Sequence, residues 1–158
     1  MHKRILVIGY GNPLRGDDGI GREVVADLAE RFTDPEVSIL TVHQLTPELS
    51  EPIHRSDLVI FVDASSQGEP GAWTCKPVTP AMAHTPALGH HFDIANLLAY
   101  TQAVFQMCPG ALVVSVAAES FTYREELSPK VRAALPAVVR HIYNQIAEFG
   151  LKQEPAHA

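Results

Sequence analysis

Residues 9–21 read GYGNPLRGDDGIG, and this stretch holds five glycines. Before it, Ile5–Ile8 is a continuous apolar run of the kind that forms a buried strand. After it, apolar residues recur at helical spacing from Ile20 to Phe32. The pattern predicts a strand, a tight turn and a helix. The glycines of the turn leave room for another group to approach the backbone closely.

Two common phosphate-binding patterns fail in this turn. The dinucleotide fingerprint requires a third glycine where Leu14 stands. The P-loop spacing fits Gly11 and Gly16, but Asp17 and Asp18 replace the lysine and the hydroxyl residue. Two carboxylates would repel a triphosphate, and acids already compensate the helix dipole there. The turn is therefore expected to face a cation.

The two consecutive aspartates have different explanations. An aspartate at the start of a helix is often only an N-cap, which contributes about 1 kcal/mol, and this explains Asp17. Only one of two neighbouring carboxylates can cap the helix. Asp18 is then either a functional group or a charge that compensates the helix dipole, and this segment alone leaves both interpretations open.

The rest of the chain alternates between strand and helix patterns. Further strands are expected at Val37–Val42, at Asp57–Asp63, at an edge position over Ala72–Val78, and at Leu112–Val116. Further helices are expected from Thr46, from Asp93 to about Met107, and from Pro129, where Pro136 should kink or split the last one; Thr79–Gly89 is expected to be an exposed loop. The alternation predicts a three-layer α/β sandwich. Its sheet is mostly parallel and twisted, with about five strands and helices on both faces.

Length and composition restrict the class of protein. The 158 residues fit one domain, expected over residues 1–150, with a frayed tail over 151–158. The net charge of -6 and the scattered basic residues give no support for nucleic-acid binding. No apolar run approaches the roughly 20 residues that cross a bilayer, and no signal peptide is recognisable, so a cytoplasmic protein is expected. Cys75 and Cys108 form no C-x-x-C pair and are expected to be buried, reduced thiols.

A second acidic group follows the most apolar predicted strand. Asp63 is expected at the rim of the sheet, because a buried charge without a partner is costly. One interpretation is a hydrogen bond to the following turn. In the other interpretation Asp63 faces Asp18, because the first and third strands of such sheets are often close in space. Two carboxylates that face one gap repel each other unless they share a proton or hold a metal.

Histidines supply a third ligand type. His84, His90 and His91 cluster before the helix that is expected from Asp93. A loop that delivers one imidazole to two carboxylates would complete an O,O,N site. Such a set suits a borderline divalent ion such as nickel or zinc, and the residues alone do not choose between them.

The motif Gly9-x-Gly11-Asn12-Pro13-Leu14-x-x-Asp17-Asp18-Gly19-Ile20-Gly21 resembles the signature of the [NiFe]-hydrogenase maturation proteases. These endopeptidases trim the C-terminus of the hydrogenase large subunit. The resemblance covers nearly the whole chain, and its other parts are Asp63, His90 with Ile94 and Leu97-Leu98, Glu119–Phe121, and Leu127–Pro129.

The resemblance implies a nickel site and an activity. Asp18, Asp63 and His90 match the family's three nickel-recognising positions and are the expected catalytic and metal-binding residues. A register slip of one residue would put His91 in place of His90. Asn12, His43 and His91 are expected to contact the substrate. The segment His43–Thr46 departs from the acidic residue and glycine-rich turn that the family commonly shows, so the hydrogenase group stays open.

The implied reaction removes the C-terminal extension of a large-subunit precursor after nickel insertion. The protease recognises the nickel that the substrate carries. Binding of another divalent metal by the free enzyme is compatible with this reaction. One carboxylate is expected to act as the general base toward water. Two alternatives stay open: a non-catalytic chaperone module that binds nickel and precursor, and a nucleotide-binding α/β domain, which the acidic turn disfavours.

Overall fold

A five-stranded sheet forms the centre of the computed structural model, which describes residues 3–84 and 90–152. The strands are β1 (Ile5–Tyr10), β2 (Val37–Val42), β3 (Leu58–Ser65), β4 (Trp73–Pro77) and β5 (Gly110–Ala117). Their order is β2-β1-β3-β5-β4; β4 pairs antiparallel with β5, and the other pairs are parallel. The mostly parallel sheet and the edge position of β4 confirm the predictions.

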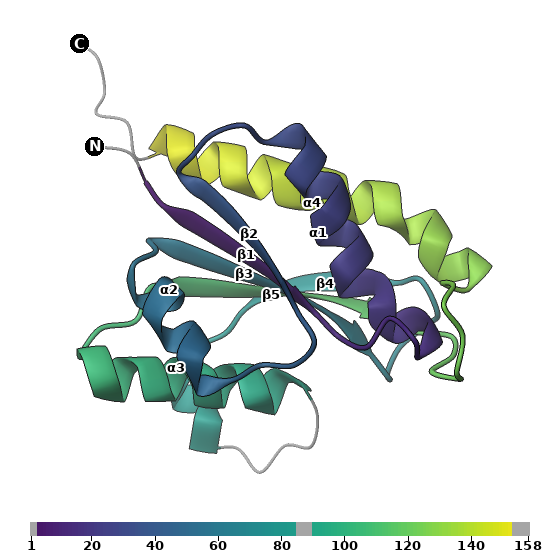
Figure 1. The fold of residues 1–158 in the computed structure, drawn as a ribbon, viewed down its shortest axis with the longest axis horizontal. Coiled ribbons are helices and arrows are strands. Elements are labelled where there is room, and N and C mark those ends of the chain that lie inside the picture. Colours follow the sequence, from purple (N-terminus) through teal and green to yellow (C-terminus); the bar gives the residue numbers. More distant parts are fainter. Residues whose placement is uncertain (1–2, 85–89, 153–158) are drawn as a thin grey trace.

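Helices cover both faces of this sheet. The helices are α1 (Ile20–Arg31), α2 (Ser50–His54), α3 (His90–Phe105) and α4 (Pro129–Lys152), and the short 3-10 helices are η1 (Gly16–Gly19), η2 (Pro47–Leu49) and η3 (Pro80–His84). Figure 1 shows α1 and α4 on one face and α2 and α3 on the other. The predicted three-layer sandwich is therefore correct.

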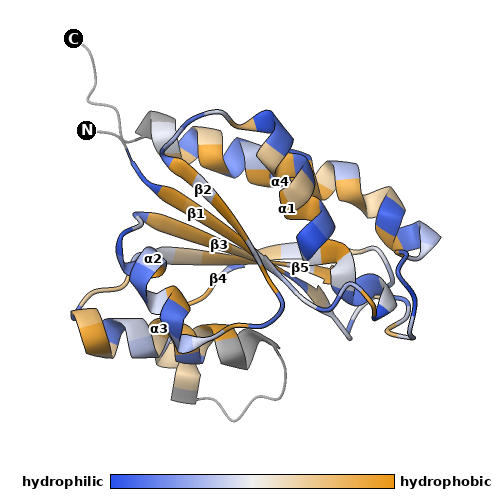
Figure 2. Cartoon of the chain, in the orientation of Figure 1, coloured by the Kyte–Doolittle hydropathy of each residue, from blue (hydrophilic) through white to orange (hydrophobic). Residues whose placement is uncertain are grey.

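The core has two parts, one on each face of the sheet. Figure 2 shows that the central strands are almost continuously apolar, as expected where both faces are covered. Side chains of β3 alternate between the two parts: Val62 packs with α1 and α4, and Phe61 packs with α2 and α3. The same alternation places Asp63 on the face of Phe61, toward the layer of α2 and α3.

Glycines let the start of α1 lie directly on the sheet. A Cβ atom on Gly21 would lie 2.5 Å from the carbonyl oxygen of Val62, and one on Gly9 would lie 2.2 Å from that of Gly21. Any larger residue would therefore push the helix away. This close packing holds η1 and the first turn of α1 against the carboxyl ends of β1 and β3, where the site residues lie.

Two element boundaries differ from the predictions. β3 runs on to Ser65, so Asp63 lies inside the strand and does not end it, because β5 keeps pairing as far as Ala117. α4 is unbroken across Pro136, so Pro136 does not split the helix, and the alternative of a kink stays a prediction. Several apolar residues of α4 pack into the core on the C-terminal side of that proline, and their burial holds the helix together: Val138, Val139, Ile142 and Ile146.

Two loop predictions also need adjustment. Part of the expected exposed loop over 79–89 is the 3-10 helix η3, and Val78 before it is buried. Residues 85–89 lie outside the described residues. α4 continues to Lys152, past the predicted boundary at 150, and the remaining tail lies outside the described residues. No helix in the described part is long and apolar enough to span a membrane, and the cytoplasmic location stays a prediction.

Candidate active site at the carboxyl edge of the sheet

The ends of three neighbouring strands bring His43, the first loop and Asp63 to one edge of the sheet. Tyr10 pairs in register with Val42, and Gly9 pairs with Val62. The residues that follow these pairs are therefore neighbours at the carboxyl edge of β2, β1 and β3. His43 comes after β2 and is exposed, as a residue that contacts a substrate must be. Its role in substrate binding stays a prediction.

Asp63 is held between two hydroxyl groups. Its side chain is only 1 % exposed. Tyr10 in β1 donates its hydroxyl hydrogen to Oδ2 at 3.0 Å, and Ser115 in β5 donates to Oδ1 at 2.7 Å. Asp63 lies near the carboxyl edge of the sheet, as predicted, but it is buried there, because these two hydroxyls take the place of water around the carboxylate. The arrangement fixes the direction of the carboxylate before any substrate arrives.

Asp18 lies on η1 and turns back over the first loop. Its Oδ2 accepts a hydrogen bond from the backbone N–H of Asn12 at 2.7 Å. A Cβ atom on Gly11 would lie 2.1 Å from the carbonyl oxygen of Asp18, so the glycine lets the backbone of Asp18 lie directly against the first loop. Asp18 is partly exposed, and nothing else in the described part of the chain bonds to its side chain. One carboxylate oxygen is thus available to a substrate.

Asn12 shapes the turn that holds Asp18. Its Oδ1 accepts a hydrogen bond from the N–H of Leu14 at 2.9 Å, and its carbonyl oxygen accepts one from the N–H of Arg15 at 3.0 Å. These contacts are those of an Asx turn. The structure gives Asn12 a part in building the loop, and its predicted contact with substrate stays a prediction.

Asp17 does not cap its own helix, so that prediction is wrong. Neither η1 nor α1 has a side-chain cap. The fully buried Asp17 carboxylate instead accepts hydrogen bonds from the backbone N–H groups of Glu119 (2.8 Å), Ser120 (3.0 Å) and Ser128 (2.7 Å), and from the Ser128 hydroxyl (2.8 Å). Burial raises the pKa of Asp17, but the hydrogen bonds, led by those of Ser128, outweigh it and hold the pKa below its usual value.

The third predicted ligand has no described side chain. α3 begins at His90, but the side chains of His90 and His91 lie outside the described residues. Within the described residues, no three His, Cys, Asp or Glu side chains gather closely enough to hold a metal. The structure does pack η1, which carries Asp18, against β3, which carries Asp63. The complete set with His90 stays a prediction.

The two cysteines are poor nucleophiles. Burial raises the pKa of both the Cys75 and the Cys108 thiol, which disfavours the reactive thiolate form. Neither forms a disulfide within the described residues, as predicted, but both are only partly buried and not fully buried as expected. The carboxylates are therefore the better candidates for chemistry in the described part of the chain.

Tyr10 and Ser115 are site residues that sequence reasoning missed. Both stand at the end of, or inside, apolar runs that predict buried strands. Each carries a hydroxyl group that needs a partner once it is buried. Asp63, at the end of a neighbouring predicted strand, is an acceptor for such hydroxyls. The sequence therefore indicates that the hydroxyls and the carboxylate need partners, but only the strand register shows which hydroxyl bonds to which carboxylate.

A three-layer α/β sandwich with two carboxylates at the carboxyl edge of its sheet, and no activated thiol among the described cysteines, has the features of a hydrolase that works with acidic groups. Known proteins narrow this class. The hydrogenase 2 maturation protease of Escherichia coli K12 is 28 % identical over 160 residues, which cover 98 % of both chains. No protein-family model matches the sequence.

Solved structures agree with the sequence comparison. The hydrogenase maturating endopeptidase HybD from E. coli superposes with a TM-score of 0.82 and 27 % identity, covering 93 % of this chain and 94 % of its own. The [NiFe] hydrogenase maturation protease HycI from Thermococcus kodakarensis KOD1 gives a TM-score of 0.75 and 25 % identity, covering 90 % and 92 %. The chain is thus similar over nearly its whole length to hydrogenase maturation endopeptidases, which confirms the resemblance seen in its first loop.

Proposed function

We propose that this endopeptidase removes the C-terminal extension of a [NiFe]-hydrogenase large-subunit precursor after nickel has been inserted. The nickel belongs to the substrate, and Asp18, Asp63 and His90 recognise it. The observation that carries this proposal is the buried Asp63 carboxylate, which two hydroxyl groups hold in a fixed direction.

The strand register supports the proposed set of ligands. Strand alternation places Asp63 toward the layer of α2 and α3, and α3 begins at His90. Asp18 comes from η1, which packs against β3. Two carboxylates and one imidazole form the mixed oxygen and nitrogen set that nickel accepts. A shift of one residue would exchange His90 for His91 without changing the chemistry.

The two carboxylates have different roles in the proposed hydrolysis. Asp63 keeps both oxygens bonded to hydroxyl groups and serves as an oriented ligand. Asp18 has an oxygen available and acts as the general base. It takes a proton from water as the water oxygen attacks the scissile carbonyl carbon, and it returns the proton to the leaving nitrogen as the C–N bond breaks. The substrate's nickel polarises the carbonyl group.

The test compares nickel-loaded with nickel-free precursor. The purified chain is incubated with each form, and the intact mass of the precursor is followed. We expect the precursor to lose the mass of its extension only when it carries nickel. Stable binding of the loaded precursor with no change in its mass would overturn the proposal and indicate a chaperone. Equal cleavage of both forms would overturn the role of nickel.

A further inference from the structure

Two loops that are far apart in the sequence pair with each other beside Asp18. The N–H of Gly16 donates to the carbonyl oxygen of Arg124 at 2.8 Å, and the N–H of Arg124 donates to the carbonyl oxygen of Leu14 at 2.9 Å. The N–H of Asp17 donates to the carbonyl oxygen of Ser120 at 3.0 Å. Residues 14–16 and 120–124 thus form one continuous surface, which we call the double-loop rim.

Buried contacts hold this rim in one shape. The Asp17 carboxylate ties the first loop to Glu119, Ser120 and Ser128 with four hydrogen bonds. Gly16 has a φ of 55°, and a Cβ atom there would lie 2.8 Å from the carbonyl oxygen of Ser120. The two loops therefore behave as one body before any partner arrives, which lowers the ordering cost of binding.

The outer side of the rim carries side chains that folding does not explain. Tyr123 is 81 % exposed and Leu14 is 37 % exposed. Arg15 is exposed and has no ion pair within the described part of the chain. Among the described residues, the Arg124 side chain has one ion pair, a loose one with Glu126 at 3.9 Å. Tyrosine and arginine are the residues that most often dominate binding energy at protein interfaces.

We infer that the double-loop rim is the docking surface for the large-subunit precursor. This inference rests on the proposed function. A metal held inside another protein reaches Asp18 only if that protein covers the surface around Asp18. The rim is one helical turn away, since the N–H of Asp18 donates to the carbonyl oxygen of Arg15 at 3.1 Å. An interface of standard size covers about 800 Å² on each partner, a patch roughly 16 Å in radius, which includes the rim.

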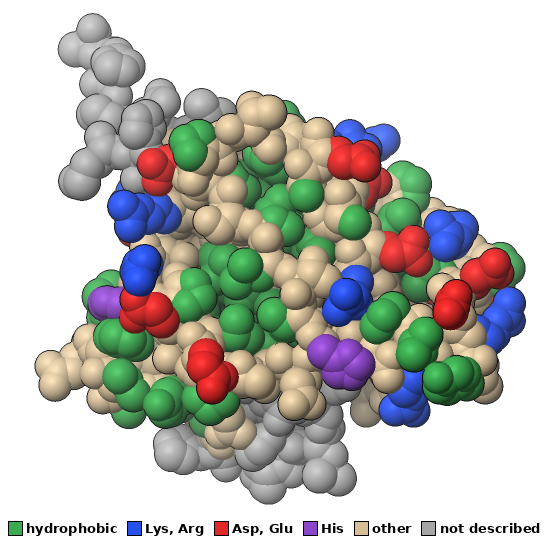
Figure 3. Space-filling view, in the orientation of Figure 1, with side chains coloured by type: hydrophobic (Ala, Val, Ile, Leu, Met, Phe, Trp, Pro, Cys, Tyr) green, Lys and Arg blue, Asp and Glu red, His purple; other side chains and the backbone are tan. Residues whose placement is uncertain are grey.

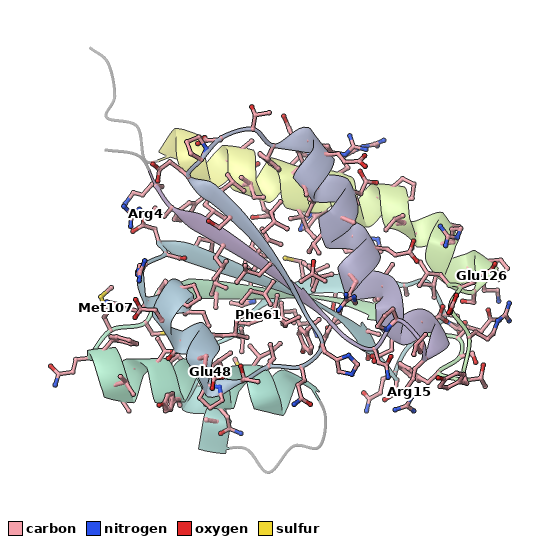
Figure 4. All side chains as sticks on the ribbon, in the orientation of Figure 1. Arg4, Arg15, Glu48, Phe61, Met107 and Glu126 are labelled. Carbon is pink, nitrogen blue, oxygen red and sulfur yellow. The ribbon has the colours of Figure 1, made fainter. Side chains whose placement is uncertain are left out.

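The chemistry of the rim defines what the precursor presents to it. Arg15 requires a carboxylate in the facing surface, because a guanidinium group pairs with one through two parallel hydrogen bonds. Tyr123 requires an apolar recess that also accepts a hydrogen bond from its hydroxyl. Figure 3 shows apolar side chains interleaved with charged ones toward the end of the molecule where Figure 4 labels Arg15 and Glu126.

The inference is tested by substituting the rim and measuring cleavage and affinity. Arg15→Ala and Tyr123→Ala are expected to raise KM for the nickel-loaded precursor at least tenfold and to change kcat less than twofold. Arg15→Glu is expected to raise KM further, and more at low salt than at high salt, because a repulsive charge replaces an attractive one. The dissociation constant of the precursor should rise in parallel with KM.

Two control substitutions lie at the other end of the molecule. Figure 4 places Arg4 and Met107 opposite Arg15, and Arg4→Ala and Met107→Ala should leave KM and the dissociation constant within twofold. Wild-type cleavage with unchanged KM in both rim variants would overturn the inference and leave the proposed function intact. Absence of wild-type cleavage would overturn the proposed function, and the dissociation constants of the same variants would still decide whether the rim binds the precursor.

Discussion

The hydroxyl of Tyr10 donates a 3.0 Å hydrogen bond to Asp63, a residue 53 positions further along the chain. Together with the bond from Ser115, it connects β1, β3 and β5 through one carboxylate. Groups that orient a ligand in this way commonly matter almost as much as the ligand itself.

Removing either hydroxyl should therefore weaken the reaction. Tyr10→Phe and Ser115→Ala are expected to lower kcat about tenfold or more each, since outer partners of a ligand contribute about 10- to 100-fold. Each variant should also lose about 1–3 kcal/mol of unfolding free energy, because a buried acceptor loses its donor. Steady-state cleavage and urea unfolding check both effects. Unchanged kcat in both variants would show that the hydroxyls do not orient Asp63.

The buried Asp17 gives the protein a defined sensitivity to acid. Its pKa in the folded chain lies below the ordinary value of 3.8, so the ionised form stabilises the fold. This stabilisation is complete well above pH 3.8 and is lost as the pH falls through the folded pKa. Asp17→Asn should cost about 3 kcal/mol at pH 7, because buried donors lose a charged acceptor.

The difference between wild type and Asp17→Asn should narrow as the pH falls below about 4, because the wild type then loses its own charged acceptor. Urea unfolding of both proteins from pH 7 to pH 2.5 measures this difference in unfolding free energy. A difference that stays constant over this range would show that the charge of Asp17 does not stabilise the fold.

Close packing of α1 on the sheet predicts a strong effect from one methyl group. Gly21→Ala would place a Cβ atom 2.5 Å from the Val62 carbonyl oxygen, so η1 must move. We expect a loss of about 2 kcal/mol or more, in the range of overpacked cores, together with lower kcat. The matched control is Gly110→Ala, where nothing lies within 4 Å. Equal unfolding free energies for the two variants would contradict the packing that we describe.

The exposed Pro136 destabilises an otherwise continuous helix. It removes one backbone hydrogen bond of α4, and its side chain is exposed. Pro136→Ala is expected to raise the unfolding free energy by about 1–3 kcal/mol with unchanged kcat. Thermal unfolding and a cleavage assay test this. A lower melting temperature would mean that the helix gains stability from the proline.

Local patterns in the sequence were sufficient to predict the fold. The β-branched residues of Val37–Val42 predicted the bounds of β2 as observed, and Pro77 indicated that β4 is an edge strand. These features depend on near neighbours in the chain. The continuity of α4 across Pro136 depends instead on burial against other elements, which overrides the local preference of proline.

The contacts of the site were harder to predict, because they join distant residues. Asp17 accepts a hydrogen bond from Ser128, which is 111 positions away. The local pattern instead favoured an N-cap, in which Asp17 would bond to its own helix. The position of Asp63 inside β3 depends on continued pairing with β5. The residue types at the site were therefore recognisable from the sequence, whereas their partners required the register of the sheet.

The most direct test of the account is the rate at which aspartate variants shorten nickel-loaded precursor. Intact-mass measurements over time compare wild type with Asp18→Asn, Asp63→Asn and the exposed control Glu30→Gln. We expect both aspartate variants to be at least 100-fold slower, with the control within twofold of wild type. Wild-type rates in both aspartate variants would contradict the claim that these two carboxylates act on the substrate's nickel.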